Sequence, residues 1–203
     1  MPPTAKLIAD WDAGASRYDA LTAPLERRFM APSRRWVTER ASGEVLEVGV
    51  GTGANLGYYA TEVRLTGLDW SSGMLNIARD KAERLTRPVE LRQGDASELP
   101  FEDASFDAVV ASFVLCSVPD PRAALREGLR VLRPGGRLLL ADHVAAHWPL
   151  RALQHLVEWV TGPRSGEYWT RRPLVALRDL DASIVETRRT TFGALECVHA
   201  QKP

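Results

Sequence analysis

The stretch VLEVGVGTG, residues 45–53, decides the fold of this chain. It begins as an apolar run of strand length and ends in a turn with glycine at Gly49, Gly51 and Gly53. Glycine lets the backbone approach a ligand closely, where a Cβ atom would collide. An apolar strand that runs into such a turn is typical of a parallel sheet that holds a ligand at its carboxyl edge.

The residues that follow this stretch predict an α/β domain. Short apolar runs alternate with amphipathic helices, which is the signature of βαβ units. Strands are expected at 44–48, 63–68, 88–92, 106–112, 136–142, 182–189 and 193–200, and helices at 54–60, 72–86, 120–132, 149–161 and 171–180. Only Phe192 and Gly193 separate the last two strands, so an antiparallel hairpin is predicted at the sheet edge. The sheet is therefore expected to be mostly parallel, with the last strand reversed.

The first forty residues have a helical pattern instead. Apolar residues recur at helical spacing between residues 4 and 18, and Pro24 is expected to start a second helix. We therefore divide the chain into a helical N-terminal flap, residues 1–42, and an α/β domain, residues 43–203. Farther along, Gly162 and the proline after it are expected to stop the helix at 149–161.

Composition excludes several classes of function. Lys and Arg number 26, as do Asp and Glu, so the chain lacks the excess positive charge that nucleic acid requires. The two cysteines, Cys116 and Cys197, are far apart and have no CxxC partner, so neither a disulfide nor a zinc site is indicated and no metal is expected. The N-terminus lacks the layout of a signal peptide, and no apolar run approaches the roughly 20 residues of a membrane helix. We expect a soluble cytoplasmic protein that touches a membrane at most at its surface.

Three acidic residues end three successive predicted strands. Glu47 stands two residues before the first glycine, where a carboxylate would repel a pyrophosphate but suits the cationic amino-acid half of S-adenosylmethionine, directly or through water. Asp69 can accept both hydroxyls of a ribose. Asp95 can accept the exocyclic N–H of an adenine, while Ala96 donates a backbone N–H. Helix capping by Asp69 and a turn role for Asp95 stay open at this point.

The glycine turn by itself leaves the cofactor undecided. Gly49-x-Gly51-x-x-Ala54 also satisfies the relaxed dinucleotide fingerprint, so a nicotinamide-dependent oxidoreductase is an alternative. No Tyr is followed four positions later by Lys, and that alternative gives Glu47 and Asp95 no purpose. A protein that binds the cofactor without catalysis is a second alternative.

Four segments in order carry a resemblance to a known family. VLEVGVGTG, GLDWS, GDASELPFEDASFDAVVASFVLCSVPDP and RVLRPGGRLLLADH resemble the successive motifs of class I S-adenosylmethionine-dependent methyltransferases, from about residue 43 to 143. The chain is similar to the ubiquinone/menaquinone-biosynthesis, phospholipid N-methyltransferase and thiol S-methyltransferase groups. The segment FVLCSV looks closest to the thiol enzymes, whereas the opening WDAGASRYD looks more like the quinone and phospholipid groups.

The resemblance implies a Rossmann-like, doubly wound sheet of seven strands with S-adenosylmethionine over its first strands and S-adenosylhomocysteine as product. By position, it assigns the glycine loop to Glu47, Gly49, Gly51 and Gly53, the ribose end to Asp69 and Trp70, the adenine end to Asp95 and Ala96, and the methyl-transfer position to Ser112 and Phe113. The acceptor is expected to be a small or lipid-like lipophilic molecule: a thiol, a phospholipid amine or a quinone-like ring.

Methyl transfer needs alignment and water exclusion more than a dedicated nucleophile. His143 and His147 follow the fifth predicted strand and are the candidate bases. The candidate substrate contacts are Tyr18, Cys116, Trp148 and Trp159. Ordinary packing stays open for each of these residues.

Overall fold

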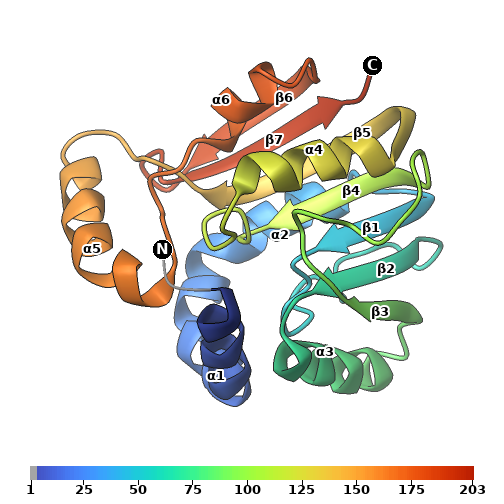
Figure 1. Cartoon of the computed structure of the whole chain (residues 1–203), viewed down its shortest axis with the longest axis horizontal. Helices are drawn as coiled ribbons and strands as arrows, with labels where there is room; N and C mark the ends of the chain where they lie inside the picture. The colour runs from blue at the N-terminus through green and yellow to red at the C-terminus, as the bar shows by residue number, and fades with distance from the viewer. Residues whose placement is uncertain (1–3) are drawn as a thin grey trace.

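Seven strands form one sheet in the computed structural model, which describes residues 4–203. The strands are β1 (Glu44–Val48), β2 (Arg64–Asp69), β3 (Val89–Gln93), β4 (Phe106–Ser112), β5 (Leu132–His143), β6 (Ser183–Thr190) and β7 (Leu195–Gln201). They lie in the order β3-β2-β1-β4-β5-β7-β6 (Figure 1). β1 to β5 pair in parallel, and β7 runs antiparallel to both β5 and β6. The predicted fold class is confirmed, with the reversed strand one place in from the edge.

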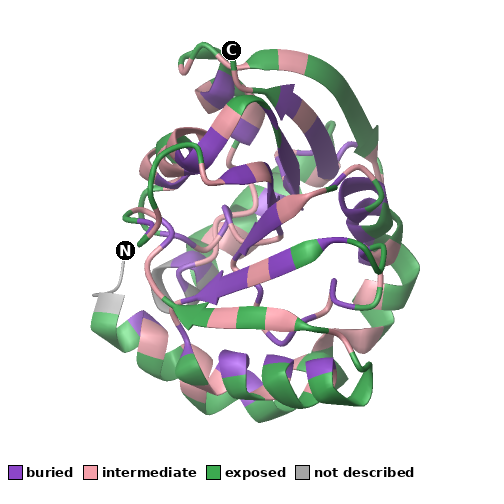
Figure 2. Cartoon of the chain, turned by 90° about the vertical axis from the view of Figure 1, so that its right-hand side faces the viewer, coloured by how far each residue is buried: buried purple, intermediate pink, exposed green. Residues whose placement is uncertain are grey.

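Helices cover both faces of this sheet. They are α1 (Thr4–Leu25), the π-helical turn η1 (Glu26–Met30), α2 (Ala31–Thr38), α3 (Ser72–Arg84), α4 (Pro121–Val131), α5 (Leu150–Ser165) and α6 (Pro173–Arg178). The strands are buried by two apolar cores: α4 and α6 pack on one face, and α2 and α3 pack on the other. Figure 2 shows the buried segments concentrated in the central strands. Side chains at successive positions of a strand alternate between the two cores, as in Val45 and Leu46 of β1.

Side chains that sequence reasoning can recognise start the two long crossover helices. Ser71 precedes α3 and accepts the backbone N–H of Met74 at 3.1 Å. Asp120 precedes α4 and accepts the N–H of Ala123 at 2.9 Å, with a proline in the first turn. These caps satisfy N–H groups that lack a partner within the helix, so each crossover helix begins directly after its cap residue.

Three predicted boundaries are wrong. α1 continues through Pro24 and leads directly into η1, so the chain stays helical from residue 4 to 38. The helix expected at 54–60 is instead a series of turns over residues 51–58, in which Leu56 and Tyr58 donate to carbonyls three residues earlier, not the four of an α-helix. α5 does not stop at Gly162 but at Gly166, which has the left-handed conformation with φ 72°.

The segment assigned to a flap contributes to the main body in two places. α2 packs on β4, β5 and β7, and its Trp36 and Val37 belong to one of the two cores. α1 instead packs against α3 and passes over the carboxyl ends of the first strands (Figure 1). α1 is therefore the part of this segment that covers the edge of the sheet where a ligand is expected.

Candidate active site

A pocket of about 760 Å³, which includes solvent at its mouth, opens at the carboxyl ends of β1, β2 and β4. Nine of the residues predicted from the sequence line it: Tyr18, Gly49, Gly51, Asp69, Trp70, Asp95, Ala96, Ser112 and Phe113. The pocket is therefore built where the parallel sheet predicted it, with the underside of α1 as its cover.

The three glycines of the turn have different roles. Gly51 has φ 55°, and a Cβ atom there would meet nothing within 4 Å, so its backbone faces open space in the pocket. A Cβ on Gly49 would lie 2.3 Å from a methyl carbon of Val114, so a larger residue would displace the β4 loop. Gly53 does not line the pocket, and a Cβ there would lie 2.6 Å from Leu56. Gly53 therefore shapes the turn, and Gly51 is the position that leaves room for a ligand.

Asp69 joins two loops at the floor of the pocket. Its carboxylate accepts the N–H of Gly51 and the N–H of Ser71, both at 2.9 Å. Burial raises the pKa of this carboxyl, and the two backbone donors act in the opposite direction. Each oxygen keeps a second lone pair for a ligand hydroxyl, so Asp69 can orient the loops and bind a ribose together. The capping role and the ribose-binding role that the sequence left open for Asp69 are therefore compatible.

Asp95 also combines a turn with a place in the pocket wall. Its Oδ1 accepts the backbone N–H of Ser97 at 2.8 Å and the Ser97 hydroxyl at 2.7 Å. Among residues 4–203 the other carboxylate oxygen accepts no hydrogen bond, and Asp95 lines the pocket beside Ala96. An adenine edge would find an acceptor and a backbone donor at this end, as the sequence predicts.

Glu47 does not line the pocket, so of the two contacts expected from the sequence, direct or through water, the structure offers no place for the direct one. Its side chain is 1% exposed and accepts hydrogen bonds from Asn55 Nδ2 at 2.8 Å and from the Tyr59 hydroxyl at 2.9 Å. Burial raises the pKa of Glu47 to about 7, although Tyr59, Arg34 and Asn55 favour the charged form. Glu47 supports the pocket wall from behind.

Arg34 of α2 is a pocket residue that sequence reasoning missed. Its Nη1 donates to Ser112 Oγ at 3.0 Å and to Asn55 Oδ1 at 3.2 Å, and its Nε donates to Glu26 at 2.8 Å. The guanidinium also lies 4.8 Å from the centre of the Phe113 ring. One signal was present in the sequence, because Arg34 shares a helical face with the buried Met30 and Val37. The arrangement holds a positive charge at the end of the pocket where methyl transfer is expected.

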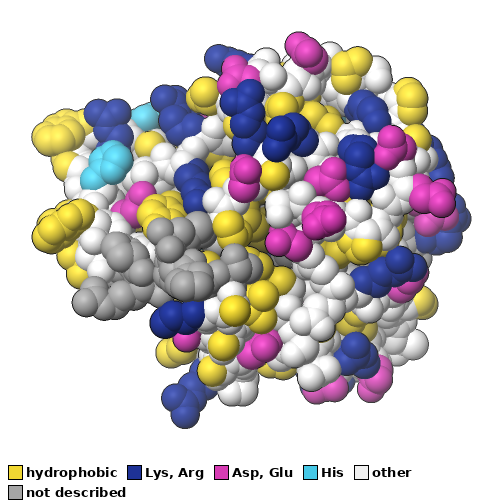
Figure 3. All heavy atoms as spheres, in the orientation of Figure 1, with side chains coloured by type: hydrophobic (Ala, Val, Ile, Leu, Met, Phe, Trp, Pro, Cys, Tyr) yellow, Lys and Arg dark blue, Asp and Glu magenta, His cyan; other side chains and the backbone are white. Residues whose placement is uncertain are grey.

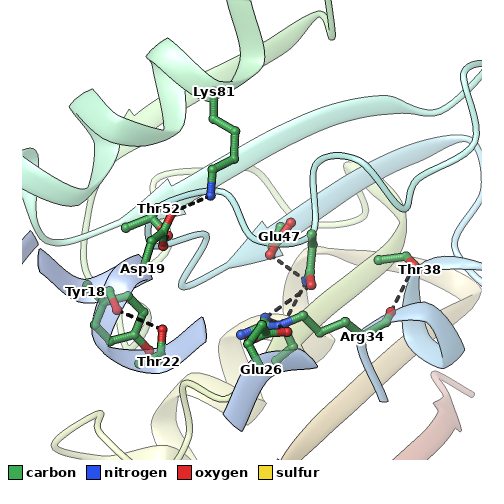
Figure 4. A network of polar contacts seen from close by, with 11 residues as sticks. Tyr18, Asp19, Thr22, Glu26, Arg34, Thr38, Glu47, Thr52 and Lys81 are labelled. Carbon is green, nitrogen blue, oxygen red and sulfur yellow. Dashed lines mark hydrogen bonds and ion pairs between the residues drawn. The ribbon is translucent and has the colours of Figure 1, made fainter. Parts of the chain in front are cut away.

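Two aspartates fasten α1 over the pocket. Asp12 accepts the hydroxyl of Ser71 at 2.6 Å and the N–H of Gly73 at 2.8 Å, at the start of α3. Two turns farther along, Asp19 accepts the Thr52 hydroxyl at 2.6 Å and the Lys81 ammonium at 2.8 Å (Figure 4). The pKa of each carboxyl is lowered, for Asp12 chiefly by the Ser71 hydrogen bond and for Asp19 by its Lys81 and Thr52 partners against the effect of burial.

The neighbouring aromatic residues of α1 face the pocket. Trp11 and Tyr18 both line it, and their ring centres are 5.8 Å apart with an edge-to-face arrangement. Burial raises the pKa of the Tyr18 hydroxyl to about 12, so this side chain stays uncharged at neutral pH. Tyr18 lies where the sequence expected it, and Trp11 joins it.

A row of aromatic side chains leads away from the far end of the pocket. The ring centre of Phe113 is 5.1 Å from that of His143, and His143 is 5.7 Å from Trp169. Burial, followed by the charge of Arg34, lowers the pKa of His143 to about 4, so the imidazole is uncharged at neutral pH and is a weak base. His147 is exposed, lies against Gly193 and does not line the pocket, which corrects its assignment as a base.

The remaining predicted substrate residues lie outside the pocket. Trp148 and Trp159 are 74% and 78% exposed on the outer surface around α5, so neither forms an inner wall for an acceptor. Cys116 is fully buried behind His143, with its sulfur 3.9 Å from His143 Nδ1, and burial raises the pKa of its thiol well above the ordinary value. Trp169 is the tryptophan of this region that approaches the acceptor end.

Comparison with known proteins gives a consistent answer. A family model described as a methyltransferase domain matches residues 46–140. A phosphatidylethanolamine N-methyltransferase of Cereibacter sphaeroides is 48% identical over 55% of this chain and 57% of that protein. A demethylmenaquinone methyltransferase of Paenarthrobacter aurescens is 38% identical over 95% of this chain and 85% of that protein. The chain thus spans little more than half of the first relative and most of the second.

A solved structure gives the same result for the fold alone. The crystal structure of a methyltransferase from Aquifex aeolicus that depends on S-adenosylmethionine has a TM-score of 0.71 and 20% sequence identity. The similarity covers 93% of this chain and 98% of that one. The helical segment, the sheet and the reversed strand therefore belong to one recurring architecture.

Proposed function

The chain belongs to the methyltransferases that depend on S-adenosylmethionine, and from that premise we propose that it methylates a lipophilic acceptor, either a phospholipid amine or a quinone-type ring. The carrying observation is the position of Phe113. This residue lines the cofactor pocket and also begins the aromatic row formed with His143 and Trp169. A methyl group at that end of the pocket would face an apolar, aromatic surface, which favours an acceptor of the same character.

The pocket suits the cofactor at each end. Asp69 and the open backbone of Gly51 would hold the ribose, and Asp95 with Ala96 would bind the adenine edge. At the other end the Arg34 guanidinium lies within reach of the terminal carboxylate expected on the amino-acid half of the cofactor. Bound there, S-adenosylmethionine supplies a methyl group on a positively charged sulfur, a leaving group that needs no further activation.

The protein's own contribution is alignment and exclusion of water. α1 closes the pocket through Asp12 and Asp19, and Tyr18 stays uncharged beneath it. Ser112 and Phe113 end β4 and set the direction from which the acceptor approaches. His143 is uncharged at neutral pH, so it adds no positive charge beside the sulfonium, and the proton that the acceptor loses on methylation would pass to water.

The names of the relatives support the two acceptor classes. The Cereibacter relative is named for a phospholipid amine, and the Paenarthrobacter relative is named for a quinone precursor. Both acceptors carry long hydrocarbon chains and partition into membranes. An enzyme that uses either one must meet a lipid surface, and the outer face of α5 provides suitable chemistry.

The outer face of α5 is apolar and carries positive charge at its side. Leu153, Leu156 and Trp159 are exposed and lie on one side of the helix, with the exposed Arg151 nearby. Figure 3 shows hydrophobic, basic and histidine side chains gathered at the end of the molecule where α5 lies. The acidic residue of the helix, Glu158, turns inward and accepts the N–H of Thr170 at 3.0 Å. This combination suits the interface of a membrane that contains acidic lipids.

The described part of the chain contains no helix that is long and apolar enough to cross a bilayer. Contact with a membrane through α5 would therefore be a contact at the surface. The segment that follows α5 carries Trp169 to the aromatic row, so a surface held by α5 would bring lipid close to the acceptor end.

A transfer assay tests the acceptor. The full chain is incubated with S-adenosylmethionine labelled in its methyl group and with one acceptor at a time: phosphatidylethanolamine vesicles, a demethylated menaquinol, a long-chain thiol, or glycine. We expect label in the phospholipid or the quinol and none in glycine. Turnover of glycine without turnover of any lipophilic acceptor would overturn the proposal.

Vesicle sedimentation tests the surface contact. Trp159→Glu should reduce binding to vesicles that contain phosphatidylglycerol, whereas the matched control Val185→Glu, at an exposed apolar position of β6, should not. Equal binding by both variants and the unchanged protein would refute a role for α5.

A further inference from the structure

Three metal-ligating side chains meet directly behind the aromatic row. Cys116 lies in the loop after β4, and Asp142 and His143 end β5. The Cys116 sulfur is 3.9 Å from His143 Nδ1, and Asp142 Oδ1 is also 3.9 Å from that nitrogen. One donor atom of each residue lies within 4.8 Å of the other two. The three donors therefore point at one common space.

The spacing is close to that of a tetrahedral metal site. Bonds of about 2.3 Å to sulfur and about 2.0 Å to nitrogen or oxygen put neighbouring ligand atoms roughly 3.3–3.6 Å apart in a tetrahedron. The two observed distances of 3.9 Å exceed this by a few tenths of an ångström. The third edge, between the Cys116 sulfur and an Asp142 oxygen, is within 4.8 Å, so the three donors would have to draw together slightly around an ion.

The surroundings hold these donors in place. Asp142 is 2% exposed, and its two oxygens accept the backbone N–H of Leu115 and that of His143, each at 2.7 Å. In metal sites the carboxylates that bind the ion are usually oriented by hydrogen bonds from neighbouring groups. The Asp142 carboxyl is thus already fixed toward His143 before any ion enters.

The local charge balance favours a cation. A carboxyl group and a thiol are buried side by side, and burial raises the pKa of both. The neighbouring cation, Arg171, donates to the carbonyl oxygens of Leu115 and Val118, both at 2.6 Å, and not to Asp142. A divalent ion would stabilise the thiolate and the carboxylate together, and on binding it would displace the thiol proton to solvent.

We propose that Cys116, Asp142 and His143 bind a divalent transition metal ion of the zinc type, through the sulfur, one carboxylate oxygen and Nδ1 of the imidazole. One thiolate, one imidazole and one carboxylate are a borderline-soft donor set, which suits zinc better than magnesium or calcium. Three protein donors leave the fourth position of a tetrahedral ion to water.

This site was not predicted from the sequence. Cys116 precedes His143 by 27 residues and has no CxxC partner, so the expectation from the sequence was that no metal binds. The ligands come together only because β4 and β5 are neighbouring parallel strands whose carboxyl ends adjoin. The inference does not depend on which acceptor is methylated.

Cobalt(II) is a suitable probe, because thiolate ligation to cobalt gives a charge-transfer band in the near ultraviolet and tetrahedral cobalt absorbs strongly in the visible. The full chain, free of any histidine tag and treated with a chelator, is titrated with cobalt(II) and then with zinc(II). We expect one equivalent of cobalt to produce both features and zinc to abolish them. Cys116→Ser should lose the charge-transfer band, and His143→Ala should weaken binding at least tenfold.

Cys197→Ala is the matched control, since Cys197 is also buried but lies on β7 outside the cluster. It should leave the cobalt spectrum unchanged. Thermal unfolding and S-adenosylhomocysteine binding show whether each variant is folded. If Cys116→Ser does not fold, loss of the visible bands in His143→Ala with the charge-transfer band also reduced tests the same site. Absence of a thiolate band in the unchanged protein, or its loss only in Cys197→Ala, would overturn the proposal.

Discussion

Replacing Glu47 by Gln should change the pH dependence of stability in a way that the structure allows to be calculated. The Glu47 carboxyl has a pKa of about 7 in the folded protein because of burial, compared with an ordinary value of 4.5. A raised pKa means that the folded state binds the proton more tightly than the unfolded state. The resulting stabilisation is fully present below pH 4.5 and is lost as the pH rises through 7.

The size of this contribution follows from linkage. With pKa values of 7 and 4.5, the proton stabilises the folded state by about 2.5 kcal/mol at pH 5 and by less than about 0.1 kcal/mol at pH 8. Gln has no such titration, so the difference in stability between the two proteins should shift by about 2.5 kcal/mol over this range. Gln also keeps only one acceptor oxygen for the two donors, Asn55 and Tyr59, which costs about 1–2 kcal/mol at every pH.

Gln resembles the protonated carboxyl, so it avoids the cost of the buried charge that the unchanged protein carries at high pH. With the hydrogen-bond loss included, Glu47→Gln should be less stable than the unchanged protein by about 1 kcal/mol or less at pH 5 and more stable by about 1–2 kcal/mol at pH 8. Urea unfolding of both proteins at pH 5, 6, 7 and 8 measures this difference, and every other titrating group cancels from it. Tyr59→Phe is the control, since it removes one hydrogen bond but leaves the carboxyl. A difference that stays constant to within about 0.5 kcal/mol from pH 5 to pH 8 would refute the raised pKa of Glu47.

Three further predictions concern the pocket and the core. Asp69→Ala should weaken S-adenosylhomocysteine binding by about 1.5–3 kcal/mol in calorimetry and also lower the stability of the free protein, because Asp69 accepts the Gly51 N–H; unchanged affinity would remove Asp69 from the site. Asp19→Asn should break the ion pair with Lys81 and speed amide hydrogen exchange within α1, while global stability falls by no more than about 1 kcal/mol. Equal exchange rates in the two proteins would show that Asp19 does not hold α1 over the pocket. Leu125→Ala, in the core beneath α4, should cost about 2–5 kcal/mol in urea unfolding without altering cofactor affinity.

The sheet could be predicted from the sequence because its strands are short apolar runs separated by clear turns. β1 and β4 have the expected bounds, and β2, β3, β6 and β7 differ by one or two residues. β5 begins four residues early because Leu132 already pairs with Phe106 of β4, ahead of an irregularity in the register. The helix expected after the glycine turn does not form, since a local apolar pattern does not distinguish a helix from a series of turns with hydrogen bonds three residues apart.

The pocket was predictable wherever its residues belong to a strand end. Asp69 and Phe113 end a strand or follow it directly, so topology alone brings them together. Arg34 and Asp19 were missed because they act from helices, through contacts that are remote in the chain: Arg34 bonds Ser112, 78 residues away, and Asp19 bonds Thr52, 33 residues away. Trp159 was predicted to contact the substrate but is exposed on the outer surface. Helical spacing shows that apolar residues share one side of a helix, but it does not show whether that side faces the protein or the solvent.

The order of the strands leaves β3 and β6 at the two open edges of the sheet. An open edge has free backbone donors and acceptors, and a neighbouring copy can add its own strand there and start aggregation. Both outer strands carry alternating charge. β3 has Glu90 and Arg92 joined in an ion pair at 2.6 Å, and β6 has Glu186, Arg188 and Arg189, all exposed. A strand from another molecule would have to bury these groups, so the sheet ends at seven strands instead of growing into a fibre.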